Sequence, residues 1–77
     1  MKLPTPHYKK VVKALEKVGF KIVGGKRNHL RLKREKQSAN DSLHIVIVPM
    51  DTEIAQGTLR SIIEQSGLTR EEFLKLL

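Results

Sequence analysis

The sequence contains no cysteine and no tryptophan, and it has only one tyrosine and two phenylalanines. Without cysteine the chain can form neither a disulfide framework nor a thiolate zinc site, and three histidines alone give little support to structural zinc. No apolar run approaches the ~20 residues that cross a bilayer, and no apolar signal core follows Lys2. We therefore expect a cytoplasmic protein that contacts no membrane. Its 77 residues predict a single domain over residues 1–77.

Acidic residues are scarce in the first half of the chain. Residues 1–36 hold twelve of the 15 lysines and arginines but only two of the eight acids, so this part carries a formal charge of +10, the remainder −3 and the whole chain +7. This uneven distribution of charge indicates a polyanionic partner, which can be a nucleic acid, an anionic membrane or an acidic protein. The alternative is a basic surface that only keeps the protein in solution. The asymmetry favours the polyanion.

The first element is predicted to be a helix. Thr5 can cap it, and Pro6 suits its first position. Gly19 is placed to end it in a left-handed conformation. Its apolar stripe, at helical spacing, consists of Tyr8, Val11, Val12, Leu15 and Val18.

Two further helices are predicted near the C-terminal end. Thr58 can cap the first of them and Gly67 can end it. Thr69 begins the second, where Glu72 three residues later completes a capping box. Their apolar sides are formed by Leu59, Ile62 and Ile63, and by Phe73, Leu74, Leu76 and Leu77.

Apolar and polar residues alternate in the centre of the chain, as they do in strands with one buried face. Gly24-Gly25 predicts a turn after the first strand, and the polar segment 37–42 predicts a loop between the second and the third. Pro49 ends the third strand. The predicted strands are residues 20–23, 29–34 and 43–48.

These elements predict an α+β domain with the order α-β-β-β-α-α. The short connections favour a three-stranded antiparallel sheet, with the helices packed on one face because nothing else can cover it. Since Leu30 and Leu32 need the core, we expect the alternating residues of the same strand on the wet face, namely His29, Arg31 and Lys33. The order resembles the double-stranded-RNA-binding-domain fold, which by itself implies no catalysis.

His29 is the strongest candidate for chemistry. Lys26, Arg27 and Arg31 surround it in sequence, and an imidazole exchanges a proton near neutral pH. It can take the proton from a ribose 2′-hydroxyl while lysine and arginine hold the phosphate and offset charge in the transition state. From the local sequence alone, a plain surface residue is the more common interpretation of such a histidine.

The other candidate groups are expected to serve the fold or to be plain surface residues. His7 is expected to be exposed at the start of the first helix. His44 can act as a second acid or base, contact RNA or serve the fold, and the last role is favoured. Asp51 and Glu53 can together bind a metal ion, but neighbouring carboxylates are common in turns, so an ordinary loop is the favoured interpretation.

Several short motifs run along the chain in a fixed order. They are Lys2-Leu3-Pro4, Ala14-Leu15-Glu16-Lys17, Gly19-Phe20, His29 ten residues after Gly19, Val48-Pro49, the segments 57–63 and 65–69, and Glu72-Phe73. At these spacings, in a chain of this length, the set resembles the HicA-type toxins of bacterial and archaeal toxin–antitoxin pairs over nearly the whole chain.

The resemblance implies a metal-independent endoribonuclease that cleaves messenger RNA through a single histidine, His29, without a cofactor. It also implies a HicB-type antitoxin partner that covers the active face, and an acidic antitoxin would suit the basic half of this chain. The residues expected to bind RNA are Lys26, Arg27, Asn28, Arg31 and Lys33.

Two positions depart from the family pattern. The family usually has Gly-Ser-His where this chain has Arg27-Asn28-His29, and it often has a histidine where this chain has Asp51. Asn28 can make the local hydrogen bonds of a serine, whereas Arg27 adds charge and replaces a flexible glycine. These changes bear on rate and RNA preference. Two alternatives stay open: a non-catalytic RNA-binding module of the same fold, and an inactive homologue that acts only through a protein partner.

Overall fold

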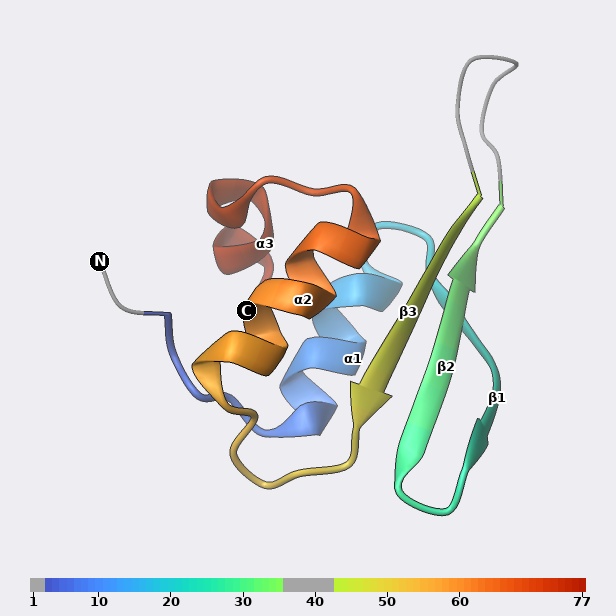
Figure 1. Cartoon of the computed structure of the whole chain (residues 1–77). Coiled ribbons are helices and arrows are strands. Elements are labelled where there is room, and N and C mark those ends of the chain that lie inside the picture. The colour runs from blue at the N-terminus through green and yellow to red at the C-terminus, as the bar shows by residue number, and fades with distance from the viewer. Residues whose placement is uncertain (1–2, 36–42) are drawn as a thin grey trace.

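Three helices and three strands follow one another in the computed structural model, which describes residues 3–35 and 43–77. The α+β class and the order α-β-β-β-α-α are therefore confirmed. Figure 1 shows the helices gathered on one side of the sheet. The elements are α1 (Tyr8–Glu16), β1 (Lys21–Lys26), β2 (His29–Arg34), β3 (His44–Pro49), α2 (Gln56–Ser66) and α3 (Arg70–Leu76).

The sheet is an antiparallel meander with β2 in its centre. Leu32 pairs with Val46 on the face that packs against the helices, and both side chains are fully buried. Arg31 pairs with Ile47 on the opposite face, where both are exposed. The predicted division of β2 between a core face and a wet face is confirmed, because successive side chains of a strand point to opposite sides.

The core lies between the sheet and the helices. Each large apolar side chain that is buried there stabilises the fold by about 1.5–3 kcal/mol relative to exposure, before entropy is counted. The largest buried apolar side chains come from every layer of the fold: Phe20, Phe73, Leu15, Leu32, Ile54, Leu59 and Ile62.

The prediction of a turn at Gly24-Gly25 is wrong. Strand β1 runs through both glycines to Lys26, with an irregularity in the pairing between Ile22 and Gly24, and the turn falls at Arg27-Asn28. Only glycine fits at position 25 of this strand, because a Cβ there would collide with the backbone carbonyl oxygen of His29. The glycine therefore permits close approach of two strands rather than a change of direction.

Two predicted helix starts are also wrong. Helix α1 begins after His7, whose Nδ1 accepts a hydrogen bond from the backbone N–H of Lys9 at 3.1 Å, so His7 and not Thr5 is the cap. Pro6 lies outside the helix because its carbonyl accepts from the N–H of Ile54 at 2.9 Å. Helix α2 begins after Ala55, which makes no side-chain cap, and Thr58 lies inside the helix.

The predicted end of α2 agrees with the structure, since Gly67 is its left-handed cap with a φ of 77°. Helix α1 ends earlier than predicted, at Glu16 with Lys17 as its right-handed cap, and Gly19 adopts its positive φ of 98° in the turn that follows. The capping box of Thr69 and Glu72 is formed in both directions. Strand β3 lies one residue later than predicted, and the loop predicted at 37–42 lies outside the described residues. Within the described ranges, no helix is long and apolar enough to cross a membrane.

Candidate functional site

His29 is the first residue of β2 and is held between both neighbouring strands. It pairs with Lys26 of β1 and with Pro49 of β3. The turn before it is anchored as well, because the carbonyl of Asn28 accepts a hydrogen bond from the N–H of Met50 at 2.8 Å. The backbone of His29 is thus fixed by the sheet, while its side chain is exposed to solvent.

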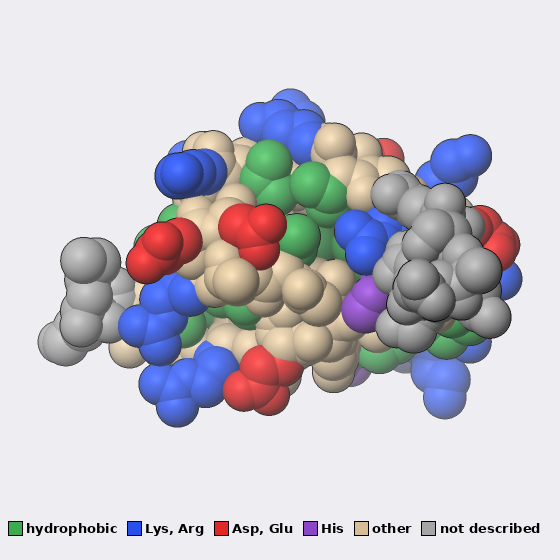
Figure 2. Space-filling view, turned by 90° about the horizontal axis from the view of Figure 1, so that it is seen from above, with side chains coloured by type: hydrophobic (Ala, Val, Ile, Leu, Met, Phe, Trp, Pro, Cys, Tyr) green, Lys and Arg blue, Asp and Glu red, His purple; other side chains and the backbone are tan. Residues whose placement is uncertain are grey.

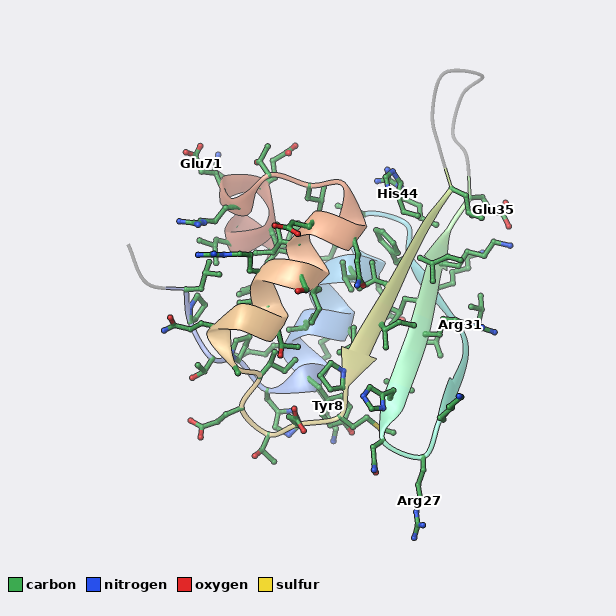
Figure 3. The ribbon with its side chains drawn as sticks, in the orientation of Figure 1. Tyr8, Arg27, Arg31, Glu35, His44 and Glu71 are labelled. Atoms are coloured by element: carbon green, nitrogen blue, oxygen red, sulfur yellow. The ribbon has the colours of Figure 1, made fainter. Side chains whose placement is uncertain are left out.

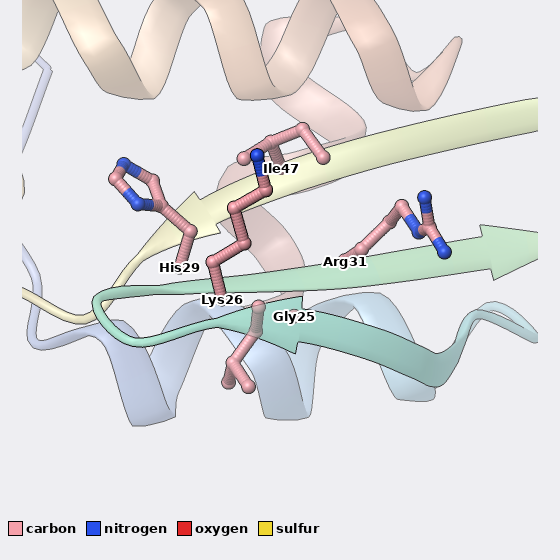
Figure 4. Close-up of a pocket in the computed structure, with 6 residues that line it drawn as sticks. Gly25, Lys26, His29, Arg31 and Ile47 are labelled. Carbon is pink, nitrogen blue, oxygen red and sulfur yellow. The ribbon is translucent and has the colours of Figure 1, made fainter.

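A cationic hollow opens on the wet face beside His29. Its charged and apolar lining comes from all three strands: Gly25, Lys26, His29, Leu30, Arg31 and Ile47. Figure 4 shows the side chains of Lys26, His29 and Arg31 projecting to the same side of the sheet. Two permanent cations beside a titratable ring can hold an anion and exchange a proton with it.

A second hollow, of different chemistry, lies on the other side of His29, between β3 and α2. Apart from His29 and Ile47, which it shares with the cationic hollow, its lining consists of the apolar Pro49 and Ile62 and of four polar residues. The polar side chains are those of Asp51, Thr58, Ser61 and Gln65. We call this the α2 hollow. None of the lysines and arginines that the structure describes lines it.

Three of the predicted RNA-binding residues lie outside the cationic hollow. Arg27 is exposed at the tip of the β1–β2 turn and points away from the body of the protein (Figure 3). Asn28 is the second residue of that turn. Lys33 lies about 13 Å from His29 along β2, where it lines a separate hollow with Lys21 and Arg34. Its ammonium forms a salt bridge to Glu35 at 3.2 Å.

Neither of the other two histidines lines a hollow beside His29. His7 caps α1, and its ring stacks on Tyr8 with 4.8 Å between the centroids. His44 begins β3 at the opposite end of the sheet from Arg27, as Figure 3 shows. The ring of His44 packs against Gly67, at the end of α2. These contacts support the structural role that the sequence favoured for His44. His7, which was expected only to be exposed, is half-buried and caps α1.

Asp51 is the one acidic residue, among those that the structure describes, that shares a hollow with His29. Asp51 lines the α2 hollow, and its backbone carbonyl accepts from the N–H of Tyr8 at 3.0 Å. Across residues 3–35 and 43–77, no group of three or more histidines, aspartates and glutamates is close enough to hold a metal ion. Most acidic side chains in the end view of Figure 2 lie over the helices.

Sequence reasoning missed the residues that α2 contributes to the α2 hollow. Thr58, Ser61 and Gln65 follow one another at i, i+3 and i+7, so they form one polar stripe along α2. That stripe runs beside the buried Leu59 and Ile62. Helical periodicity therefore carries the signal for the stripe, but its position beside His29 depends on how α2 packs on β3.

Comparison with known protein families places most of the chain within one family profile. A family profile described as "HicA toxin of bacterial toxin-antitoxin" matches residues 8–68. The matched range spans α1, the whole sheet and α2, and so contains both hollows around His29. No curated protein matches the chain.

Proposed function

The chain belongs to the HicA toxin family, whose profile matches most of its length, and we propose that it is an endoribonuclease that cleaves messenger RNA. His29 is the single catalytic residue of this proposal. The observation that carries it is the position of His29, which is exposed yet fixed at the edge of a hollow that also presents Lys26 and Arg31.

The imidazole of His29 acts on the ribose next to the cleaved bond. It takes the proton of the 2′-hydroxyl as that oxygen attacks the adjacent phosphorus. The bond from phosphorus to the 5′-oxygen breaks, and the departing oxygen takes a proton from the imidazolium or from water. Lys26 and Arg31 hold the phosphate and offset the negative charge that develops on its oxygens.

The remaining predicted contacts extend this site along the RNA. Arg27 and Asn28 at the turn, and Lys33 farther along β2, contact phosphates on either side of the cleaved bond. No step requires a metal ion or another cofactor, because an imidazole and fixed cations supply proton transfer and charge stabilisation.

A HicB-type antitoxin is the proposed protein partner, in the cytoplasm. The basic part of the chain favours an acidic partner surface. Ile45 and Ile47 are exposed on the same sheet face as the cationic residues of β2. A partner that covers this face therefore needs apolar groups next to its acids.

Expression without an antitoxin tests the proposal. The wild-type protein should arrest growth and fragment messenger RNA, and His29→Ala should do neither. His7→Asn is the matched control: it removes another histidine but keeps a side-chain acceptor at the cap of α1, so it should stay toxic. Purified protein should cleave RNA equally well with and without a chelator.

Three outcomes would overturn the proposal. Equal toxicity of wild type and His29→Ala would remove His29 from the mechanism. Salt-sensitive RNA binding without cleavage products would indicate a non-catalytic RNA-binding module. A tight complex with an acidic partner, without affinity for RNA, would indicate a protein-interaction domain.

A further inference from the structure

His29 separates two hollows that differ in charge. On one side lie Lys26 and Arg31, and on the other lies the α2 hollow, with hydroxyls, an amide and the carboxylate of Asp51. A phosphate is favoured in the first hollow and disfavoured in the second, because Asp51 repels it and no described lysine or arginine lines that hollow to compensate.

A nucleotide is divided in a matching way, into an anionic part and a neutral part. Its phosphate is an anion, whereas its base is neutral and carries hydrogen-bond donors and acceptors along one edge. We propose that the α2 hollow binds the base of the nucleotide next to the cleaved bond and thereby sets the sequence preference of the enzyme. This inference rests on the proposed ribonuclease function.

Gln65 supplies the most defined contact for such a base. Its Oε1 accepts a hydrogen bond from the backbone N–H of Ile47 at 3.1 Å, across the free edge of β3. An N–H can only donate, so the amide oxygen must face Ile47, and the NH2 group is the donor that Gln65 has available for a ligand. Gln65 thus presents a donor of fixed orientation, which selects an acceptor on the base.

Ser61 and Asp51 supply hydrogen-bond acceptors, which complement the donor of Gln65. The Ser61 hydroxyl donates to the carbonyl of Gly57 at 3.3 Å, so its oxygen is left as an acceptor. The ionised carboxylate of Asp51 can only accept. Together with Gln65 they suit a base edge on which an N–H donor stands next to a carbonyl or ring-nitrogen acceptor. A base with these groups in another order leaves a donor or an acceptor of the hollow unpaired, and that lowers its affinity.

Gln65→Glu tests the assignment with little change of shape. A glutamate oxygen can still accept from Ile47, while the second oxygen replaces the NH2 donor by an acceptor. Gln56→Glu is the matched control, since it places the same charge on the exposed first turn of the same helix, outside the α2 hollow. Thr58→Val provides a second variant, which removes a hydroxyl from the lining without adding charge. Thermal unfolding checks that each variant folds.

The readout is the distribution of cleavage sites on a pool of short RNAs in which the bases around one position are varied. We expect Gln65→Glu to change the ratio of rates between the best and the other bases by at least about fivefold. Thr58→Val should shift the same ratio, and Gln56→Glu should leave it as in the wild type. Lys26→Ala should lower cleavage at all sites alike, because phosphate contacts carry no sequence information.

The outcomes separate the two proposals. If the wild type cleaves the pool and folded Gln65→Glu and Thr58→Val keep its site distribution, the base-binding role of the α2 hollow is overturned and the ribonuclease function stands. If Gln56→Glu changes the distribution as much as Gln65→Glu does, charge alone explains the effect and the role is again overturned. If the wild type cleaves none of the RNAs, the ribonuclease function and this inference both fail.

Discussion

Lys26 and His29 are direct partners at the end of the β1–β2 hairpin, where the chain reverses through Arg27-Asn28. Cross-strand partners have Cα atoms about 4.5–5.5 Å apart and side chains on the same face. The ammonium and the imidazole are therefore brought together by strand register and not by a flexible loop. This arrangement makes the hairpin end the most informative place for mutation.

Loss of the Lys26 charge should weaken RNA binding and cleavage. We expect Lys26→Ala to lower kcat/KM by roughly ten- to a hundredfold, because a cation next to the reacting phosphate stabilises the transition state more than the ground state. The slope of log affinity against log salt should fall by about one. Lys10→Ala, on the exposed side of α1, is the control and should change the rate by much less. Equal effects of both substitutions would argue for a diffuse basic surface.

Substitution of the two strand glycines should have unequal effects. A Cβ at Gly25 meets the backbone carbonyl oxygen of His29, which cannot move without the strand, so Gly25→Ala should destabilise the fold by about 1–3 kcal/mol and displace His29. A Cβ at Gly24 meets only the flexible end of Arg31, at 3.4 Å. Urea unfolding and cleavage assays should therefore find Gly24→Ala close to wild type. The reverse order would contradict the pairing of β1 with β2.

The glycines at the two ends of α2 should also differ. Gly67 has a φ of 77°, and a Cβ there would lie 2.6 Å from Cε1 of His44. Gly67→Ala should thus cost at least about 1–2 kcal/mol and lower the melting temperature. Gly57 has no atom within 4 Å of its Cβ position, and Gly57→Ala should raise stability by up to about 1 kcal/mol. Calorimetry of both variants checks the pair, and a stable Gly67→Ala would contradict the left-handed end of α2.

Acid should weaken the start of α3. The backbone and side-chain hydrogen bonds of Thr69 hold the pKa of Glu72 below its ordinary value, and Lys75 lowers it further. Because the folded-state pKa is the lower one, the stabilisation is complete above the ordinary glutamate pKa and is lost as the pH falls through the lowered value. Glu72→Gln keeps the capping box but removes the titration. The stability difference between wild type and variant should depend on pH in this acidic range, and a constant difference would refute the role of the charge.

Much of the fold follows from local sequence patterns. The alternation around Leu30 and Leu32 is enough to assign the two faces of β2, because a one-residue shift would bury charges. Gly67 and the Thr69–Glu72 box mark helix boundaries through conformations and hydrogen bonds that involve only neighbouring residues. His29 could be placed on the wet face for the same reason, whereas the catalytic role proposed for it rests on the family resemblance.

Only the tertiary structure decided where β1 ends and what lies beside His29. Gly24-Gly25 has the composition of a turn, yet the strand continues through both residues because they pair with β2. A strand is stabilised mainly by its contacts with neighbouring strands, and these contacts outweigh the local preference for a turn. Likewise, the stripe of Thr58, Ser61 and Gln65 is visible in the sequence, but its position depends on the packing of α2 against β3. The sequence alone therefore determined that His29 and its basic neighbours share the wet face, because strand alternation is local. The packing of distant segments determined the position of the α2 hollow on the other side of His29.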